Sequence, residues 1–246
     1  MAKNNNIRSV AHQGFSTTAQ YYGNSRISSY VGAAQMGFDY GETDLKFTAD
    51  NIPVCSHDKT FTDTHDGVTK VTIAECTLAE LKTYGYCGET IATLDEVLFT
   101  CKTLGLGLYI DHLSPEWDDA KWETIFLLVK KYAMEDHVAW LTTHRPIIDR
   151  IQAWYKKSAI NLVTGADDLM PLIELAKEIK NDWNEVSINA NHARLTVEQV
   201  IAYNRILPPG ITLELWTVDK PELFEAFLPY LSAITSNKIC ANNFLK

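Results

Sequence analysis

The sequence lacks the features that mark membrane proteins, secretory precursors and zinc-binding modules. No apolar run of about 18 residues, the length of a membrane-spanning helix, occurs in the chain of 246 residues. The polar segment 1–6 has none of the apolar character of a signal peptide. The five cysteines form no CxxC pair and have no zinc spacing, so we expect free, mostly buried thiols and a reducing, cytoplasmic location.

Positive charge is also in short supply. The chain has 22 lysines and arginines against 31 aspartates and glutamates, which gives a net charge of −9. This balance argues against nucleic acid as the main partner, because binding to a phosphate backbone needs a basic surface. It leaves a small anionic substrate open, since a metal or a local cation reverses the field inside a pocket. No linker rich in Pro, Gly or Ser divides the chain, so we expect one domain over residues 1–246.

What the sequence does contain is an alternation of short apolar runs and longer amphipathic stretches. Eight strand-like runs lie at Ile7–His12, Phe38–Leu45, Leu106–Asp111, His137–Leu141, Ile160–Val163, Glu185–Asn189, Ile211–Val218 and Ala233–Ser236. Helix-like stretches lie between them at Arg26–Met36, Leu94–Leu104, Trp117–Tyr132, Arg145–Tyr155, Leu172–Ile179, Val197–Arg205 and Pro221–Leu228, and another begins at Leu78–Leu81. This order predicts an α/β fold, a (β/α)8 TIM barrel. A doubly wound open sheet is the alternative, but its nucleotide-binding forms carry a Gly-rich fingerprint that is absent here.

One segment, residues 46–76, does not fit the alternation. It is rich in Thr, Asp and His, and we interpret it as a small insertion after strand 2. A long loop in a compact domain is more often functional than accidental, so we expect this insertion to contribute to the site.

Carboxylates end two of the expected strands. Glu42 and Asp44 stand at i and i+2 and therefore point the same way, and Asp111 ends the third strand-like run. The carboxyl ends of barrel strands meet at one rim, so the three acids would converge and repel one another. A divalent cation would hold them together, and all-oxygen ligation selects Mg²⁺ or Ca²⁺. A lone E-x-D pair is more often a cap or a salt-bridge partner; Asp111 at a matching strand end favours metal binding.

Two histidines stand near the same rim. His12 ends the first strand-like run, and His57 ends a short apolar run inside the insertion. An isolated histidine is usually structural. Here two imidazoles would flank a metal-bound phosphodiester, one removing a proton from the nucleophile and the other protonating the leaving alkoxide. Zinc ligation by His57 and His65 is a weaker alternative, because this spacing fits no strong motif.

These residues also carry the pattern of a known family. Residues 12–14, His-Gln-Gly, compare with a His-Arg-Gly motif, and residues 42–44 with an E-x-D pair. Residues 53–58 compare with Pro-Val-x-x-His-Asp, and residues 215–219, Leu-Trp-Thr-Val-Asp, with Val-Trp-Thr-Val-Asn. Taken together at these spacings, the motifs resemble those of the glycerophosphodiester phosphodiesterases from the first strand to the last.

The resemblance implies a Ca²⁺- or Mg²⁺-dependent hydrolysis of glycerophosphodiesters to glycerol 3-phosphate and an alcohol. His12 and His57 then match the acid/base pair. Glu42, Asp44 and Asp111 match the metal ligands, although the third ligand of the family is usually glutamate. The substrate would be a small-molecule phosphodiester.

Three positions depart from the family pattern, and at two of them a phosphate-binding cation is missing. Gln13 stands where an arginine is usual, Asn24 where the glutamate of Pro-Glu-Asn is usual, and Leu113 where a lysine is usual. Gln13 can still donate a neutral hydrogen bond, which is weaker than the arginine fork. Arg26 could supply a replacement cation, although a solvated residue in the first helical turn is the more ordinary interpretation. We therefore expect weak affinity for simple glycerophosphodiesters.

Trp216 is the third candidate for substrate binding, beside Gln13 and Arg26. It lies near the end of the seventh strand, and large aromatic side chains at barrel mouths commonly wall ligand sites. The alternative is a core tryptophan that points toward the helices, because neighbouring side chains of a strand alternate between faces.

Two other functions compete with the leading hypothesis. One is a phospholipase D-like phosphodiesterase, which would use the same pair of histidines on lipid substrates. The other is a non-catalytic barrel that binds a ligand and keeps the site as a relic. The missing cations favour a relic, whereas the retention of two histidines and three repelling acids disfavours it. The sequence identifies neither the alcohol, nor the metal, nor the oligomeric state.

Overall fold

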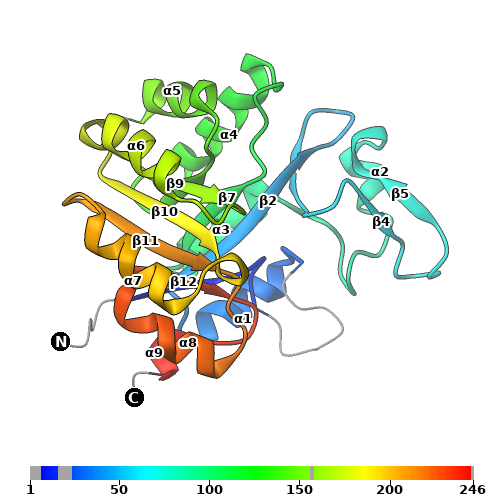
Figure 1. Cartoon of the computed structure of the whole chain (residues 1–246). Coiled ribbons are helices and arrows are strands. Elements are labelled where there is room, and N and C mark those ends of the chain that lie inside the picture. The colour runs from blue at the N-terminus through cyan, green and yellow to red at the C-terminus, as the bar shows by residue number, and fades with distance from the viewer. Residues whose placement is uncertain (1–6, 16–23, 156–157, 245–246) are drawn as a thin grey trace.

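The structure, a computed structural model, describes residues 7–15, 24–155 and 158–244. Within them, eight parallel strands form a closed barrel: β1 (Arg8–Ala11), β2 (Tyr40–Phe47), β7 (Gly107–Asp111), β8 (Val138–Leu141), β9 (Ala159–Thr164), β10 (Glu185–Asn191), β11 (Ile211–Trp216) and β12 (Ala233–Ser236). Their order is β1-β12-β11-β10-β9-β8-β7-β2, and the pairing of β1 with β2 closes the ring (Figure 1). The predicted (β/α)8 barrel is confirmed.

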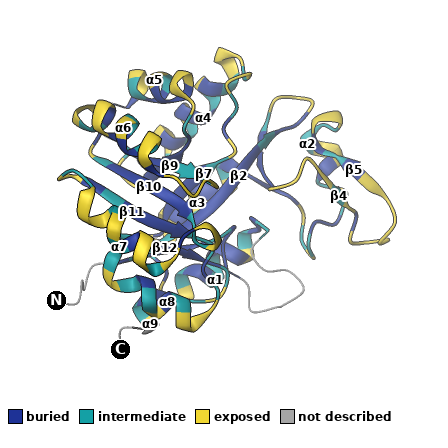
Figure 2. Cartoon of the chain, in the orientation of Figure 1, coloured by how far each residue is buried: buried dark blue, intermediate teal, exposed yellow. Residues whose placement is uncertain are grey.

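Helices cover the outside of this barrel. They are α1 (Ile27–Gln35), α3 (Leu94–Leu104), α4 (Asp119–Lys131), α5 (Arg145–Trp154), α6 (Met170–Ile179), α7 (Val197–Ile206) and α8 (Pro221–Phe227), and a short α9 (Ala241–Phe244) follows the last strand. Their inner faces are buried against the strands and their outer faces are exposed (Figure 2). The sequence determines both ends of α3. Thr93 and Glu96 form a reciprocal capping box at its start, and Gly105 ends the helix in a left-handed conformation.

The alternation of strand side chains decides which residues reach the site. On β7, Leu108 and Ile110 pack outward in the large core between barrel and helices, whereas Tyr109 packs in the smaller core inside the barrel. Asp111, two residues after Tyr109, therefore points inward at the rim. The same period of two directs alternate residues of each strand into the barrel mouth.

The segment between β2 and α3 forms a small unit beside the barrel (Figure 1). It contains β3 (Pro53–Cys55), β4 (Thr60–Thr62), β5 (Lys70–Thr72), a 3-10 helix (Ile73–Glu75), α2 (Leu78–Leu81) and β6 (Ala92–Thr93). β3 joins the main sheet because it pairs antiparallel with both β2 and β6. A separate apolar cluster fills the unit: Val54, Val71, Ile73, Leu81, Tyr86 and Ile91.

This unit differs in extent from the expected insertion, residues 46–76. Strand β2 continues through Phe47, and the apolar cluster includes Ile91. The difference arises because Leu78–Leu81 is helical, with a capping box at Thr77, and so resembles the first turn of the next barrel helix. That helix is α3, which starts only at Leu94.

Two expectations on cysteines and membrane spans can be compared with the structure. All five cysteines are free, and Cys55, Cys101 and Cys240 are buried. In the part of the chain that the structure describes, no helix combines the length and the apolar composition that crossing a membrane requires.

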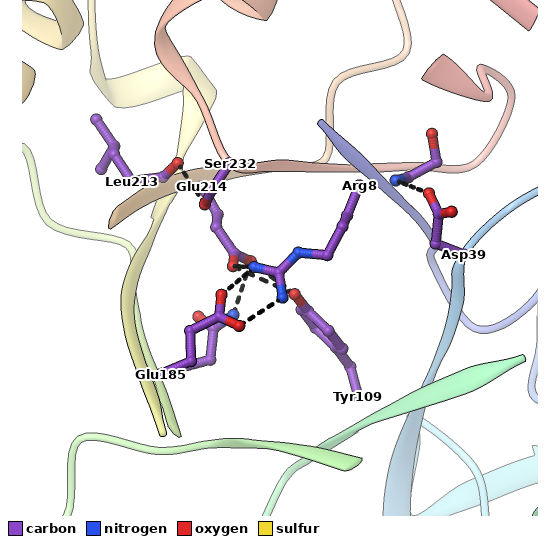
Figure 3. Close-up of polar contacts among 9 residues, drawn as sticks. Arg8, Asp39, Tyr109, Glu185, Leu213, Glu214 and Ser232 are labelled. Atoms are coloured by element: carbon purple, nitrogen blue, oxygen red, sulfur yellow. Dashed lines mark hydrogen bonds and ion pairs between the residues drawn. The ribbon is translucent and has the colours of Figure 1, made fainter. Parts of the chain in front are cut away.

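A buried ionic network ties several strands together inside the barrel (Figure 3). The guanidinium of Arg8 pairs with Glu185 and lies 3.1 Å from Oε1 of Glu214. Glu214 also accepts hydrogen bonds from the Tyr109 hydroxyl at 3.1 Å and from Asn161 Nδ2 at 2.7 Å. Glu214 is 1% exposed, and burial raises its pKa despite these partners. The network thus joins residues of β1, β7, β9, β10 and β11.

Arg8→Met should therefore destabilise the protein strongly. The substitution leaves Glu214 buried without its cation, and breaking a buried pair in this way costs about 3–5 kcal/mol. Chemical denaturation measures the change in the free energy of unfolding. Lys82→Met is the matched control, because it breaks the exposed pair with Glu96 and should cost about 1 kcal/mol or less. Equal effects of the two substitutions would contradict the structural role of the network.

Candidate active site

A cavity of about 140 Å³ opens at the C-terminal ends of the barrel strands. Its apolar wall comes from β8, β9 and β11, through Leu141, Val163 and Trp216. Its polar wall consists of His12, Glu42, Asp44, His57, Asp111, His112, Asn189 and Thr235. Chemistry in barrel enzymes is performed at this rim, so the cavity is the candidate active site.

The three predicted acids lie together in this cavity. The parallel register of β2 and β7 places Asp44 directly beside Asp111, and Glu42 is two residues earlier on the same face of β2. Each of the three offers a carboxylate oxygen within 4.8 Å of the other two. Burial, followed by repulsion from Asp44 and Asp111, raises the pKa of Glu42 well above its ordinary value. Burial also raises the pKa of Asp111, with a further contribution from Asp44.

The surroundings of the acids fit a divalent cation. Glu42 and Asp44 are 4% and 2% exposed, and Oδ2 of Asp44 has no hydrogen-bond partner among the described residues. Oε2 of Glu42 accepts one hydrogen bond, from the backbone N–H of Gln13 at 2.8 Å. Buried acceptors without donors are costly, and a cation would satisfy them and remove the repulsion. The all-oxygen set suits Mg²⁺ or Ca²⁺.

His12 is held in a defined orientation behind the cavity. Its Nδ1 lies 2.9 Å from Oδ1 of Asn237, and the amide of Asn237 donates to Oδ2 of Asp219 at 2.7 Å. Because the amide group of Asn237 is used as the donor toward Asp219, its oxygen faces His12 and requires a proton on Nδ1. The Nε2 atom of His12 then has a free lone pair, as a proton acceptor requires.

His57 comes from the unit between β2 and α3. It follows β3 and also lines the cavity, with a half-exposed side chain. Its Nδ1 lies 2.8 Å from Oδ1 of Asp58. This carboxylate fixes the ring in the same way as Asn237 fixes His12, with the proton on Nδ1 and Nε2 available for chemistry.

The residues predicted to bind the substrate, Gln13, Arg26 and Trp216, differ in their position relative to the cavity. Trp216 lines the cavity, and its indole N–H donates to the carbonyl oxygen of Asn189 at 3.3 Å, so it points into the barrel mouth rather than toward the helices. The side chain of Gln13 is absent from the cavity lining, although its backbone contacts Glu42.

Arg26 is buried away from the cavity and is not among its lining residues. Its Nη1 donates to the carbonyl oxygen of Cys87 at 2.8 Å and lies 3.8 Å from Glu89. These contacts anchor α1 to the small unit, so Arg26 does not replace the missing phosphate-binding cation in this arrangement. The suggested partner of His57 in a zinc site, His65, belongs to no potential metal group among the described residues.

Two residues of this region were missed by the sequence reasoning. His112 has a φ of 56°, a left-handed conformation that turns its side chain back toward the rim. Its ring centroid lies 4.9 Å from that of His57, and its Nδ1 lies 3.3 Å from Asp44. Lys46 places its ammonium 3.1 Å from Nδ1 of His112. A signal for Lys46 was present, since it continues the spacing of two from Glu42 and Asp44.

Comparison with known proteins identifies the family. The sequence profile of the Glycerophosphoryl diester phosphodiesterase family matches residues 12–232. The chain belongs to this family. It is therefore a phosphoric diester hydrolase, and the resemblance seen in its motifs is confirmed. A search of curated proteins finds no significant match.

Solved structures of glycerophosphodiester phosphodiesterases share the fold. A Galdieria sulphuraria protein of this type has a TM-score of 0.79 and 23% identity, with 97% of each chain covered. A glycerophosphodiester phosphodiesterase from Parabacteroides distasonis has a TM-score of 0.72 and 24% identity, with 94% of this chain and 93% of that chain covered. An Oleispira antarctica phosphodiesterase, solved with the product sn-glycerol-3-phosphate, has a TM-score of 0.69 and 19% identity, with 94% and 92% covered.

The pH dependence of stability should reveal the acid cluster. In EDTA, the raised pKa of Glu42 means that the folded state holds its proton more tightly than the unfolded chain does. The stabilising effect of this proton is complete below the ordinary value near 4.5 and is lost as the pH rises through the raised pKa. Wild type and Glu42→Gln, which mimics the protonated acid, should thus be similarly stable at low pH. The variant should be more stable at high pH.

Thermal unfolding with Ca²⁺ or Mg²⁺ provides the second half of this test. The cation should stabilise wild type more than Glu42→Gln, because binding to the folded state alone raises its stability. The order of the two melting temperatures at high pH should therefore reverse. If Glu42→Gln melts below wild type in EDTA at every pH, the acids are not in repulsive contact.

Proposed function

We propose that the protein hydrolyses glycerophosphodiesters to glycerol 3-phosphate and an alcohol, with a divalent cation and a pair of histidines. The observation that carries the proposal is the convergence of three carboxylates and two oriented histidines on one cavity of a phosphodiesterase barrel. The product sn-glycerol-3-phosphate bound to the Oleispira antarctica phosphodiesterase supports the choice of product.

Glu42, Asp44 and Asp111 would hold the cation. When bound, Mg²⁺ or Ca²⁺ supplies positive charge that neutralises the phosphodiester. The carboxylates fix its place at the rim, and the apolar wall of Leu141 and Val163 limits the water around it. Trp216 would pack against the carbon atoms of the substrate.

His12 and His57 would divide the proton transfers. One Nε2 would accept a proton from the attacking water as the new P–O bond forms. The other ring would start protonated on both nitrogens and give its Nε2 proton to the alkoxide as the P–O bond to the alcohol breaks, so that no strong base leaves. Asn237 and Asp58 act as positioning residues, because each contacts Nδ1 of one histidine at 2.8–2.9 Å.

We extend this proposal to the domain organisation of the chain and to its location. Residues 1–246 would act as one phosphodiesterase domain, in which the insertion after strand 2, including residues 46–76, supplies His57. Since all five cysteines are free, a reducing, cytoplasmic location suits the protein.

Substitution of either histidine should nearly abolish turnover. His12→Ala and His57→Ala should each lower kcat by about 10²–10⁴-fold, because each removes one proton transfer. The assay is hydrolysis of glycerophosphocholine and of bis(p-nitrophenyl) phosphate with Ca²⁺ or Mg²⁺. His137→Ala is the matched control, because His137 is exposed just before β8 at the opposite end of the barrel. Wild-type kcat in either of the two cavity variants would remove that histidine from the mechanism.

The same assay separates the competing functions. The proposed enzyme should lose activity in EDTA and regain it with Ca²⁺ or Mg²⁺. A phospholipase D-like enzyme would instead prefer lysophospholipids over glycerophosphocholine. A relic barrel would hydrolyse none of these esters with either metal, and that result would refute the proposed function.

A further inference from the structure

A second, larger recess adjoins the catalytic cavity. This groove of about 910 Å³ lies between the small unit and the segment that joins β7 to α4, and it shares His57 and His112 with the cavity. The cavity alone, at about 140 Å³, has room for a cation and a phosphate group but little more. Ligand sites usually measure about 300–1,000 Å³, so part of the substrate must extend beyond the cavity. Because His57 and His112 line both spaces, the groove is continuous with the catalytic cavity.

The groove concentrates positive charge in an otherwise acidic protein. Lys46, Lys59 and Lys121 line it, although the chain as a whole has a net charge of −9. No carboxylate of the described residues lies within 4.0 Å of the ammonium of Lys46 or Lys59. Lys121 has only a loose contact, 3.9 Å from Asp118. Three lysines outside the groove, Lys82, Lys131 and Lys177, have carboxylates at 2.8, 2.6 and 2.6 Å.

The acids of the groove do not cancel this charge. Asp58 and Glu116 are the carboxylates in its lining. Asp58 is engaged with the ring of His57 at 2.8 Å, and its side chain is 77% exposed. Lys46 also faces the acids Asp44 and Asp111 of the catalytic cavity. Lys59 and Lys121 are therefore the ammonium groups of the groove that remain for an anionic ligand.

The lysines have different surroundings in the groove. Lys46 borders the catalytic cavity, because its ammonium is 3.1 Å from His112. Lys121 borders an aromatic part, because its ammonium lies 5.7 Å from the centre of the Phe47 ring. Phe47 and Trp117 meet edge to face at 5.0 Å and form an aromatic wall there. A ligand with a carbon skeleton and an anionic group could pack on this wall and bind the ammonium groups.

We propose that the groove binds one alcohol moiety of the phosphodiester and selects an alcohol that carries its own anionic group, a phosphate monoester or a carboxylate. This inference rests on the proposed phosphodiesterase function. The groove would also supply cations to a protein that lacks the arginine and lysine of the family pattern at positions 13 and 113.

The test compares two substrates that differ only in the charge of one alcohol. Glycerophosphoglycerol presents a neutral alcohol, and glycerophosphoglycerol phosphate presents the same alcohol with a phosphate monoester. Wild type should have a kcat/KM about tenfold or more higher for the anionic substrate, the effect of one charge-assisted contact. This ratio should fall as the salt concentration rises, because the lysines are partly exposed.

Two lysine variants localise the selectivity. Lys59→Gln and Lys121→Gln should each lower the ratio of the two kcat/KM values by about three- to tenfold. Lys130→Gln is the matched control, because it removes an exposed lysine from α4 outside the groove and should leave the ratio unchanged.

The outcomes separate the groove from the catalytic mechanism. Equal hydrolysis of both substrates, or a preference for the neutral one, would overturn the groove proposal and leave the phosphodiesterase function standing. The groove proposal would also be overturned by a selective wild type whose ratio is unaffected in both lysine variants. Hydrolysis of neither substrate with Ca²⁺ or Mg²⁺ would count against the proposed function, and the groove assignment would fall with it.

Discussion

Mutual repulsion among three carboxylates, two of them buried, is the constraint on which the site depends. Neighbouring parallel strands carry Asp44 and Asp111 in register, so the fold itself forces the two acids together. Deeper in the barrel, the guanidinium of Arg8 balances the charge of the buried carboxylate of Glu214. At the rim no arginine or lysine lines the catalytic cavity among the described residues. A cation from solution would stabilise the ionised form of this cluster.

Barrel and insertion contribute different parts of the site. The barrel strands and the turn after β1 supply the acids, the apolar wall and His12. The small unit supplies His57 and one lysine of the groove, and Arg26 ties it back to the barrel through Cys87 and Glu89. Its separate apolar cluster means that the unit can vary without disturbing the barrel core. The barrel thus forms most of the cavity, and the small unit forms one side of the groove.

Periodicity explains how much of this arrangement could be predicted from the sequence. Eight apolar runs specified the barrel, and a spacing of two placed Glu42 and Asp44 on one face. His112 could not be predicted, because only its left-handed backbone returns the side chain to the rim. The contacts of Arg26 could not be predicted either, because its partners, Cys87 and Glu89, are far away in the sequence. Contacts of this kind depend on tertiary packing and leave no local pattern.

Calorimetric titration of Ca²⁺ and Mg²⁺ into metal-free protein tests the central claim most directly. The account predicts one ion per chain and a clear loss of affinity in Asp44→Asn, whose carboxylate is central to the cluster. Asp136→Asn, an exposed acid just before β8 at the opposite end of the barrel, should bind the ion as wild type does. Absence of binding to the wild type, or binding that Asp44→Asn leaves unchanged, would contradict a metal site at this rim.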